Sequence, residues 1–399
     1  MKITDLKCAV IGNHPVVRIT TDEGIDGIGA GEASKPYLKP HVLFYKDLIL
    51  GEDPRDVERV MRRIRRMGAF KPWGTAVSAI EVALWDLAGK AAGQPIYRML
   101  GGKVRDKVRV YNGNIRKKLK SYSPEDMADN MKWMKDLPQG FTIIKQGIAF
   151  HGAMATEVPN YYYGDVENKE RFPKRGRMTE YGLKHTVACV EAMKEVLGDE
   201  IGLALDVGPG VIPQDALKLA KALEHLNLMW MEDMITGDYT PYVTAELYRD
   251  VSINTTTPIH TGEQIYLRQN FMDLIEKRAV DVVGPDPLDV GGIAELKWIA
   301  EYADLHGIDM APHGTLDGLI GLAALVQVCA TLPQNYIAFE LPNGNPEWWH
   351  DIIEGLPPKD QIVKNGFIDV WDTPGLGIKF NVEATKKYLK EEDKDFFKN

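Results

Sequence analysis

Acidic residues recur at the ends of short apolar runs between Leu203 and Glu340. Five of the six runs in this stretch end in a carboxylate and one ends in a histidine; the final residues are Asp206, Glu232, Glu263, Asp286, His313 and Glu340. The runs are roughly 25 residues apart with helical patterns between them, which indicates the parallel strands of βα units. Since a barrel of such units gathers the C-terminal ends of its strands around one mouth, we expect these side chains to converge.

The first three acids in this series suit a metal ion. Asp206, Glu232 and Glu263 offer carboxylate oxygens and no thiolate or imidazole, a ligand set that favours a hard cation such as Mg²⁺. Without a cation, three anions in a partly desolvated site would repel one another strongly. A single strand-end acid more often caps the following helix, but three on successive units favour a metal site.

Asp286 and His313 end the next two units, so neighbouring strands would bring a carboxylate to an imidazole. A carboxylate that accepts from one ring nitrogen fixes the tautomer and raises the basicity of the other nitrogen. His313 precedes Gly314 and could instead belong to a helix cap. Its place after three acids favours a general base or acid.

A lysine ends another apolar run. The segment Phe141–Lys145 predicts a buried strand, and an amine at its end needs a polar mouth or a counter-ion. The alternative is that Lys145 extends along the surface to reach solvent. Its place in the βα series favours the mouth.

The order of these residues resembles that of the enolase superfamily, mandelate racemase subgroup. A second, independent segment, Thr75–Lys90 continuing through Gly93-Gln94-Pro95 to Leu100-Gly101-Gly102, is similar to the helix and exit of that family's capping domain. The resemblance covers nearly the whole chain. It implies an α/β fold, a (β/α)7β TIM-like barrel with an N-terminal α+β capping domain.

The N-terminal pattern agrees with this implication. Three strands are predicted at Ile3–Ile11, His14–Thr21 and Gly24–Glu32, followed by helical periodicity from Pro40 to Leu100. Strands followed by helices indicate a separate α+β domain. We expect a capping domain at 1–107, a barrel with the active site at 108–365, and a C-terminal return onto the capping domain at 366–399.

The resemblance also implies a reaction. Family members remove the proton next to a carboxylate, and Mg²⁺ stabilises the resulting enediolate, a pattern for which the enolase superfamily is itself the type example. By the same resemblance, Lys145 places a second cation on the substrate carboxylate and Glu340 hydrogen-bonds that group. The first loop of the capping domain reaches substrate in the family, so His14 or the segment Ser34–Tyr37 would contact it here.

One departure from the family pattern narrows the reaction. Racemases of this subgroup end the second barrel strand in Lys-x-Lys, whereas this chain has Lys145-Gln146-Gly147. Glycine carries no acid or base, so racemisation by two bases loses its partner. We therefore predict dehydration of a sugar acid, in which the α-proton is removed and the β-hydroxyl leaves as water, giving a 2-keto-3-deoxy acid. His313 could act as both base and acid, or as the acid for an unidentified base.

Two alternatives stay open. A racemase, epimerase or cycloisomerase of a carboxylate would follow if Lys145 took the place of the second lysine. The second alternative is a non-catalytic binding protein with the same barrel fold. A binding scaffold, however, has no need for a paired histidine and aspartate.

Composition limits the partners. The 399 residues carry a net charge of −9 without a basic patch, so no nucleic-acid partner is expected. Cys8, Cys189 and Cys329 are isolated and lack metal-ligand spacing. There is neither an N-terminal signal core nor an apolar stretch of membrane-span length, which predicts a cytoplasmic protein. A homo-oligomer, either a dimer or an octamer, is also expected.

Two segments depart from the alternating pattern. Residues 151–177 contain Tyr161-Tyr162-Tyr163 and a basic run and are too long for an ordinary βα loop, so they either shape the substrate pocket or form an oligomer contact. The tail Lys387–Asn399 is highly charged, and we expect it to fray.

Overall fold

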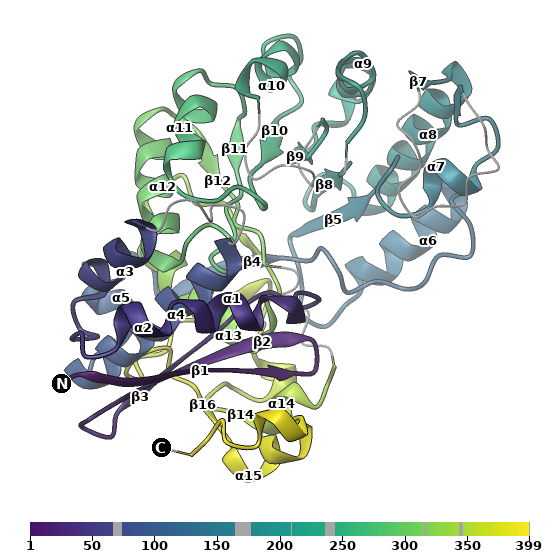
Figure 1. Cartoon of the computed structure of the whole chain (residues 1–399). Coiled ribbons are helices and arrows are strands. Elements are labelled where there is room, and N and C mark those ends of the chain that lie inside the picture. Colours follow the sequence, from purple (N-terminus) through teal and green to yellow (C-terminus); the bar gives the residue numbers. More distant parts are fainter. Residues whose placement is uncertain are drawn as a thin grey trace.

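The computed structural model describes residues 1–66, 74–163, 177–208, 210–235, 244–314, 317–342 and 346–398. An antiparallel sheet begins the chain, with β1 (Ile3–Ile11), β2 (His14–Thr21) and β3 (Asp26–Ala30) in that order (Figure 1). β1 and β2 have the predicted limits, and β3 is shorter than predicted. Ile11 pairs with His14 across a tight turn in which Gly12 has a φ of 62°.

Helices cover this sheet and connect it to the rest of the molecule. They are α1 (Lys39–Phe44), α2 (Lys46–Ile49), α3 (Val57–Arg66), α4 (Gly74–Ala92) and α5 (Ile96–Met99), with a short 3-10 turn at Pro36–Leu38. α4 lies directly on the sheet, because a Cβ atom at Gly27 or Gly29 would collide with its backbone carbonyls. The predicted capping helix therefore exists, and two glycines of β3 allow its close approach.

Buried acids on α4 accept hydrogen bonds from three parts of the chain. The Asp86 carboxylate accepts from the backbone N–H of Ile28 at 2.9 Å and of Leu376 at 2.8 Å. The Glu81 carboxylate accepts from the backbone N–H of Ile293 at 2.8 Å and of Ala294 at 3.0 Å, at the start of a barrel helix. α4 thus fixes the sheet, the barrel and the C-terminal segment relative to one another.

A closed parallel barrel forms the second layer, with the expected strand order. In the described part of the chain its strands number eight: β4 (Lys107–Tyr111), β5 (Ile143–Gly147), β8 (Gly202–Asp206), β9 (Trp230–Glu232), β10 (Ile259–Thr261), β11 (Val282–Val283), β12 (Asp309–Met310) and β13 (Phe339–Glu340). Six of them form one sheet, β5-β8-β9-β10-β11-β12, and β13 pairs with β4. Bridges at Asn112–Ile144 and Met310–Tyr336 complete the closure.

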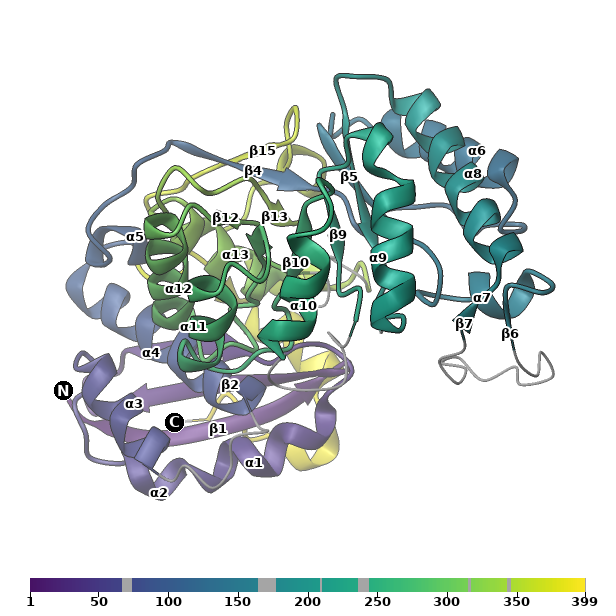
Figure 2. The same cartoon turned by 90° about the horizontal axis from the view of Figure 1, so that it is seen from above.

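Helices follow the barrel strands and surround them on the outside, as Figure 2 shows. They are α6 (Pro124–Lys135), α8 (Glu180–Leu197), α9 (Pro213–Ala222), α10 (Ala245–Ser252), α11 (Gln269–Glu276), α12 (Ile293–Leu305) and α13 (Gly318–Cys329). α6 begins at a capping sequence, because the Ser123 side chain accepts from the Asp126 N–H and Pro124 opens the helix. The predicted fold, a TIM barrel with an N-terminal cap, is confirmed.

The long segment after β5 is only partly described. It contains α7 (Met154–Glu157) and a two-stranded ribbon of β6 (Tyr162–Tyr163) and β7 (Arg177–Met178). Most of the basic run lies outside the described residues. Tyr161 is buried and its hydroxyl lies 2.6 Å from Thr186 Oγ1 on α8.

The C-terminal segment contacts both layers. Its elements are α14 (Trp349–Ile352), β14 (Ile353–Glu354), β15 (Phe367–Asp369), β16 (Lys379–Phe380) and α15 (Val382–Thr385), with 3-10 turns at Lys386–Tyr388 and Glu391–Asp393. β15 pairs antiparallel with barrel strand β4, and the chain then runs back beside the N-terminal sheet (Figure 1). The predicted domain limits of 1–107, 108–365 and 366–399 stay a prediction.

The prediction of a frayed tail is wrong. Asp393 and Phe396 are buried, and Asp393 Oδ2 accepts from the Val10 N–H at 3.1 Å. The Arg18 guanidinium donates to the Phe396 carbonyl at 3.2 Å. The high charge of the tail favoured a solvent-exposed segment, so the sequence did not predict these contacts. Among the described residues, no helix is both long and apolar enough to cross a membrane.

Candidate active site

The acids predicted at the strand ends lie around one mouth of the barrel. Asp206, Glu232 and Glu340 are the last residues of β8, β9 and β13, and Asp206 pairs in register with Glu232. The remaining residues follow their strands by two or three positions: Glu263, Asp286 and His313. The parallel register therefore accounts for their convergence.

His313 and Asp286 are in contact. His313 Nδ1 lies 2.6 Å from Asp286 Oδ2, and both side chains are buried. The other ring nitrogen, Nε2, lies 3.3 Å from Glu263 and 3.5 Å from Glu340. Burial alone would lower the pKa of His313, but Glu263, Asp286 and Glu340 outweigh it and raise that pKa well above its usual value.

Lys145 lies in the middle of β5, which corrects its predicted place at the strand end. The strand continues to Gly147, because residues 143–147 all pair with β8. Lys145 nevertheless reaches the acids, with Nζ at 2.7 Å from Glu232, 3.3 Å from Glu340 and 3.4 Å from Asp206. Burial disfavours its charge, but these acids outweigh burial and raise its pKa well above its usual value.

In the part of the chain that the structure describes, one cluster of carboxylate oxygens includes a residue that the sequence did not predict. Carboxylate oxygens of Glu232, Asp233 and Glu263 all lie within 4.8 Å of one another. Asp233 directly follows Glu232, has a φ of 49° and accepts a hydrogen bond from Thr261 at 2.5 Å. Asp206 adjoins the cluster through Lys145. Asp206 thus stays a predicted ligand, and Asp233 joins Glu232 and Glu263 as a candidate.

The environment of Glu232 fits a cation. Burial, together with the negative charges of Asp206, Glu263 and Glu340, raises the pKa of Glu232 to about 8 despite the nearby Lys145. A nearby positive charge stabilises the ionised form of such a buried acid and lowers its pKa. An all-oxygen donor set of this kind suits Mg²⁺. The residues present therefore fit the metal that the sequence predicts.

A buried histidine lies beside Glu232. His260, on β10, has Nε2 at 3.1 Å from the Ala311 carbonyl and Nδ1 at 3.6 Å from Glu232. Burial lowers the pKa of His260 to about 3, so the ring is neutral. Trp230 Nε1 donates to Glu232 Oε2 at 3.0 Å. The only sequence signal for this support was a histidine inside an apolar strand.

His151 also reaches the acids and was not identified from the sequence. Its Nδ1 lies 3.2 Å from Asp206 Oδ1 and 3.0 Å from the Gly208 carbonyl. Burial alone would raise the pKa of Asp206, but His151 and Lys145 outweigh it and lower that pKa. A cavity of about 450 Å³ opens beside His151, lined also by Gln146, Gly147 and Tyr122.

The predicted capping-domain residues lie against segments that follow barrel strands. His14 is buried and packs edge-on against Trp349, with ring centroids 4.8 Å apart. Lys35 is ion-paired with Glu32 and with Asp289, which lies three residues beyond Asp286. Contact of His14 with substrate stays a prediction.

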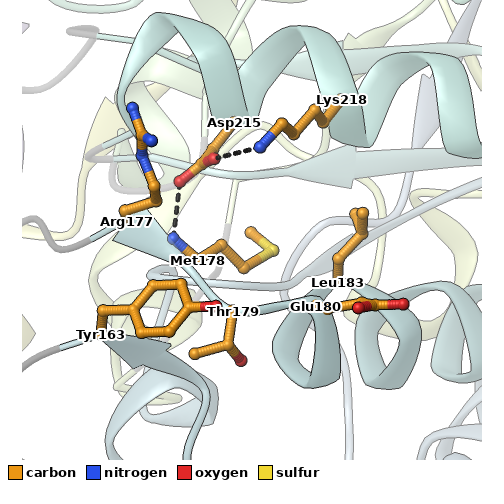
Figure 3. Close-up of a pocket in the computed structure, with 8 residues that line it drawn as sticks. All are labelled: Tyr163, Arg177, Met178, Thr179, Glu180, Leu183, Asp215 and Lys218. Carbon is orange, nitrogen blue, oxygen red and sulfur yellow. Dashed lines mark hydrogen bonds and ion pairs between the residues drawn. The ribbon is translucent and has the colours of Figure 1, made fainter.

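A second cavity, of about 420 Å³, lies between α8, α9 and the β6–β7 ribbon. Figure 3 shows Asp215 accepting from the Met178 N–H and paired with Lys218, at 2.6 and 3.9 Å. None of the predicted site residues lines it.

Comparisons with known proteins cover both layers of the fold. The family pattern of the mandelate racemase / muconate lactonizing enzyme N-terminal domain matches residues 10–101, and that of the enolase C-terminal domain-like family matches residues 132–385.

Individual relatives match along most of their length. A D-xylonate dehydratase of Haloferax volcanii is 31% identical over 400 residues, covering 98% of this chain and 89% of the relative. A D-mannonate dehydratase of Caulobacter sp. is 29% identical, covering 97% and 95%. A solved mandelate racemase/muconate lactonizing enzyme-like protein from Rubrobacter xylanophilus superposes with a TM-score of 0.82 at 29% identity, covering 98% of both chains.

Proposed function

This chain belongs to the enolase superfamily, in its mandelate racemase and muconate lactonizing enzyme family, and on that premise we propose that it is an acid-sugar dehydratase. The substrate is a sugar acid with hydroxyls on the α- and β-carbons. The product is a 2-keto-3-deoxy acid. The relatives that carry the dehydratase names match over nearly the full chain, which supports this choice.

One observation carries the proposal: His313 contacts Asp286 through one ring nitrogen and lies near Glu263 and Glu340 through the other. With Nδ1–H donated to Asp286, the Nε2 atom is the one that faces the mouth. Such a group, placed within hydrogen-bond reach, can take a proton from carbon and return it. We assign His313 as the catalytic base and Asp286 as the residue that orients it. A cation bound by Glu263 would offset the charge that contributes most to raising the pKa of His313, and so favour the neutral ring that a base requires.

The other residues of the barrel mouth would stabilise the negative charge that develops on the substrate. We propose that Asp206, Glu232 and Glu263, with Asp233 beside them, hold Mg²⁺. Mg²⁺ bound there would offset the negative charge that develops on the substrate carboxylate as the α-proton leaves. Lys145 provides a second cation for the same carboxylate. Glu340 lies 3.3 Å from Lys145 Nζ, where it can hydrogen-bond that carboxylate through a shared proton.

The position of Gly147 supports dehydration over racemisation. Gly147 pairs in register with Asp206, whereas Lys145 lies two residues deeper in the strand. This register supports the alignment in which Lys145 is the first lysine of Lys-x-Lys and the second is absent. A cytoplasmic location and a homo-oligomeric state stay predictions.

The test is a panel of mono- and diacid sugars, including D-xylonate and D-mannonate, incubated with the enzyme and Mg²⁺ in D₂O. Formation of a 2-keto-3-deoxy acid from at least one of them is expected. Recovery of an epimer with deuterium at the α-carbon and without keto acid would instead identify a racemase or epimerase.

A further inference from the structure

Gly147 stands where two-base relatives carry their second lysine, yet its backbone does not require glycine. Its φ lies outside the left-handed region, so any residue could adopt this conformation. Side chains two apart on a strand point to the same face, and Lys145 points into the barrel mouth. A side chain at 147 would therefore also point toward the acids.

The space for that side chain is filled by His151. A Cβ atom at residue 147 would overlap with His151 Cδ2 and lie 3.4 Å from Nε2. The chain turns back on itself after β5, because the His151 N–H donates to the Ile148 carbonyl at 2.9 Å and Ala149 has a φ of 53°. The imidazole thus occupies the volume that the second lysine would take.

The ring is also oriented. His151 Nδ1 lies 3.0 Å from the Gly208 carbonyl, which can only accept, so Nδ1 carries a proton. The opposite nitrogen, Nε2, is then left for a ligand. The side chain is 35% exposed and lines the cavity formed with Gln146, Gly147 and Tyr122.

His151 and His313 contact opposite ends of the predicted ligand series. His151 contacts Asp206 on β8, and His313 contacts Glu263 after β10. We propose that His151 is a second catalytic residue, which protonates the departing β-hydroxyl from the side of the substrate opposite His313. This inference rests on the proposed dehydratase function and makes the elimination anti rather than syn.

The proton balance closes without a co-reactant. His313 takes the α-proton, and the electrons of that C–H bond form the enediolate. The β-carbon–oxygen bond then breaks, and the oxygen receives a proton from Nε2 of the His151 imidazolium and leaves as water, which leaves a neutral ring with its proton on Nδ1. The enol becomes the keto acid by protonation at the β-carbon and loss of its hydroxyl proton, and both histidines return to their starting state by exchange with solvent.

Substitution of His151 separates the two steps. With His313 intact, His151→Asn should still exchange the α-proton of the accepted sugar acid in D₂O, measured by NMR, at a rate within about tenfold of wild type. Keto-acid formation should fall by about 10²- to 10⁴-fold, the contribution of a placed proton donor. Binding of Mn²⁺, followed by its EPR signal, should be retained.

A second variant tests the same point without touching the histidine. Gly147→Ala places a methyl group where the ring lies and should reduce keto-acid formation while sparing exchange. The matched control is His225→Asn, a surface histidine whose side chain is 56% exposed and pairs with Glu191; it should behave as wild type.

The possible failures are distinguishable. Keto-acid formation by His151→Asn at the wild-type rate would overturn the inference, as would loss of exchange and dehydration together with Mn²⁺ binding intact. If wild-type enzyme itself forms no keto acid from any sugar acid, the proposed function fails and the inference fails with it.

Discussion

The buried carboxylates of α4 and those of the barrel mouth are neutralised differently. On α4, Glu81 and Asp86 accept mainly from backbone N–H groups. At the barrel mouth, Glu232 and Glu340 face the side chain of Lys145, and Glu340 also faces His313. The first arrangement has one geometry, whereas the second consists of charged groups that can turn toward a ligand.

The α4 acids therefore contribute to the stability of the fold, whereas the acids of the barrel mouth contribute to the chemistry. Backbone donors are placed by the fold and cannot move without unfolding it, so the α4 acids hold elements together. Side-chain cations lower the pKa values of the acids around them and can exchange partners. Substitutions in the two regions should therefore change different measurements.

The largest effect is expected for His313→Asn. Turnover should fall by about 10²- to 10⁴-fold, because asparagine cannot take or give the proton. Circular dichroism and the unfolding midpoint should stay close to wild type. Asp286→Asn should lose less, about 10- to 100-fold, since the imidazole survives with the wrong orientation. If His313→Asn kept more than a tenth of wild-type turnover, the base would have to be sought elsewhere.

Glu232→Gln should lower turnover by about 10²- to 10³-fold, as is typical when one preorganised electrostatic group is removed. It should also weaken binding of Mg²⁺ measured by calorimetry. EDTA treatment of wild-type enzyme is the matched experiment, and activity should return on adding Mg²⁺. Full activity in metal-free enzyme would contradict the assignment of this cluster.

Asp86→Ala should act on the free energy of unfolding instead. It leaves the N–H groups of Ile28 and Leu376 and the ammonium of Lys90 without their buried acceptor, a loss of about 3 kcal/mol or more. Urea unfolding measures this, and turnover per folded molecule should be retained. The control is Asp22→Ala, whose carboxylate accepts from the exposed Lys2 N–H and should cost less than about 0.5 kcal/mol.

The smallest expected effect is a pH dependence. Burial raises the pKa of Glu81 from 4.5 to about 7, so the folded protein binds this proton more tightly than the unfolded chain. The contribution of Glu81 to stability is therefore present below about pH 4.5 and is lost as pH rises to 7, about 2 kcal/mol between pH 5 and 7. Glu81→Gln should remove this part of the slope in urea unfolding, and an unchanged slope would refute it.

The sequence predicted the features that depend on local pattern or on strand order. The limits of β1 and β2 and the meeting of Asp286 with His313 each follow from alternation or the succession of βα units.

The sequence did not predict features that depend on strand pairing or on a reversal of chain direction. The length of β5, and so the depth of Lys145, is set by its pairing with β8. His151 comes to the mouth only because a turn reverses the chain, and His260 supports Glu232 across strands. No local pattern encodes either contact.

The burial of Asp393 against Val10 has a consequence for biosynthesis. The two residues are 383 positions apart, and Phe396 likewise contacts Arg18 from the far end of the chain. The N-terminal sheet emerges from the ribosome first but acquires these partners only after almost the entire polypeptide has been translated. During that interval the Val10 N–H and the Arg18 guanidinium lack these C-terminal partners.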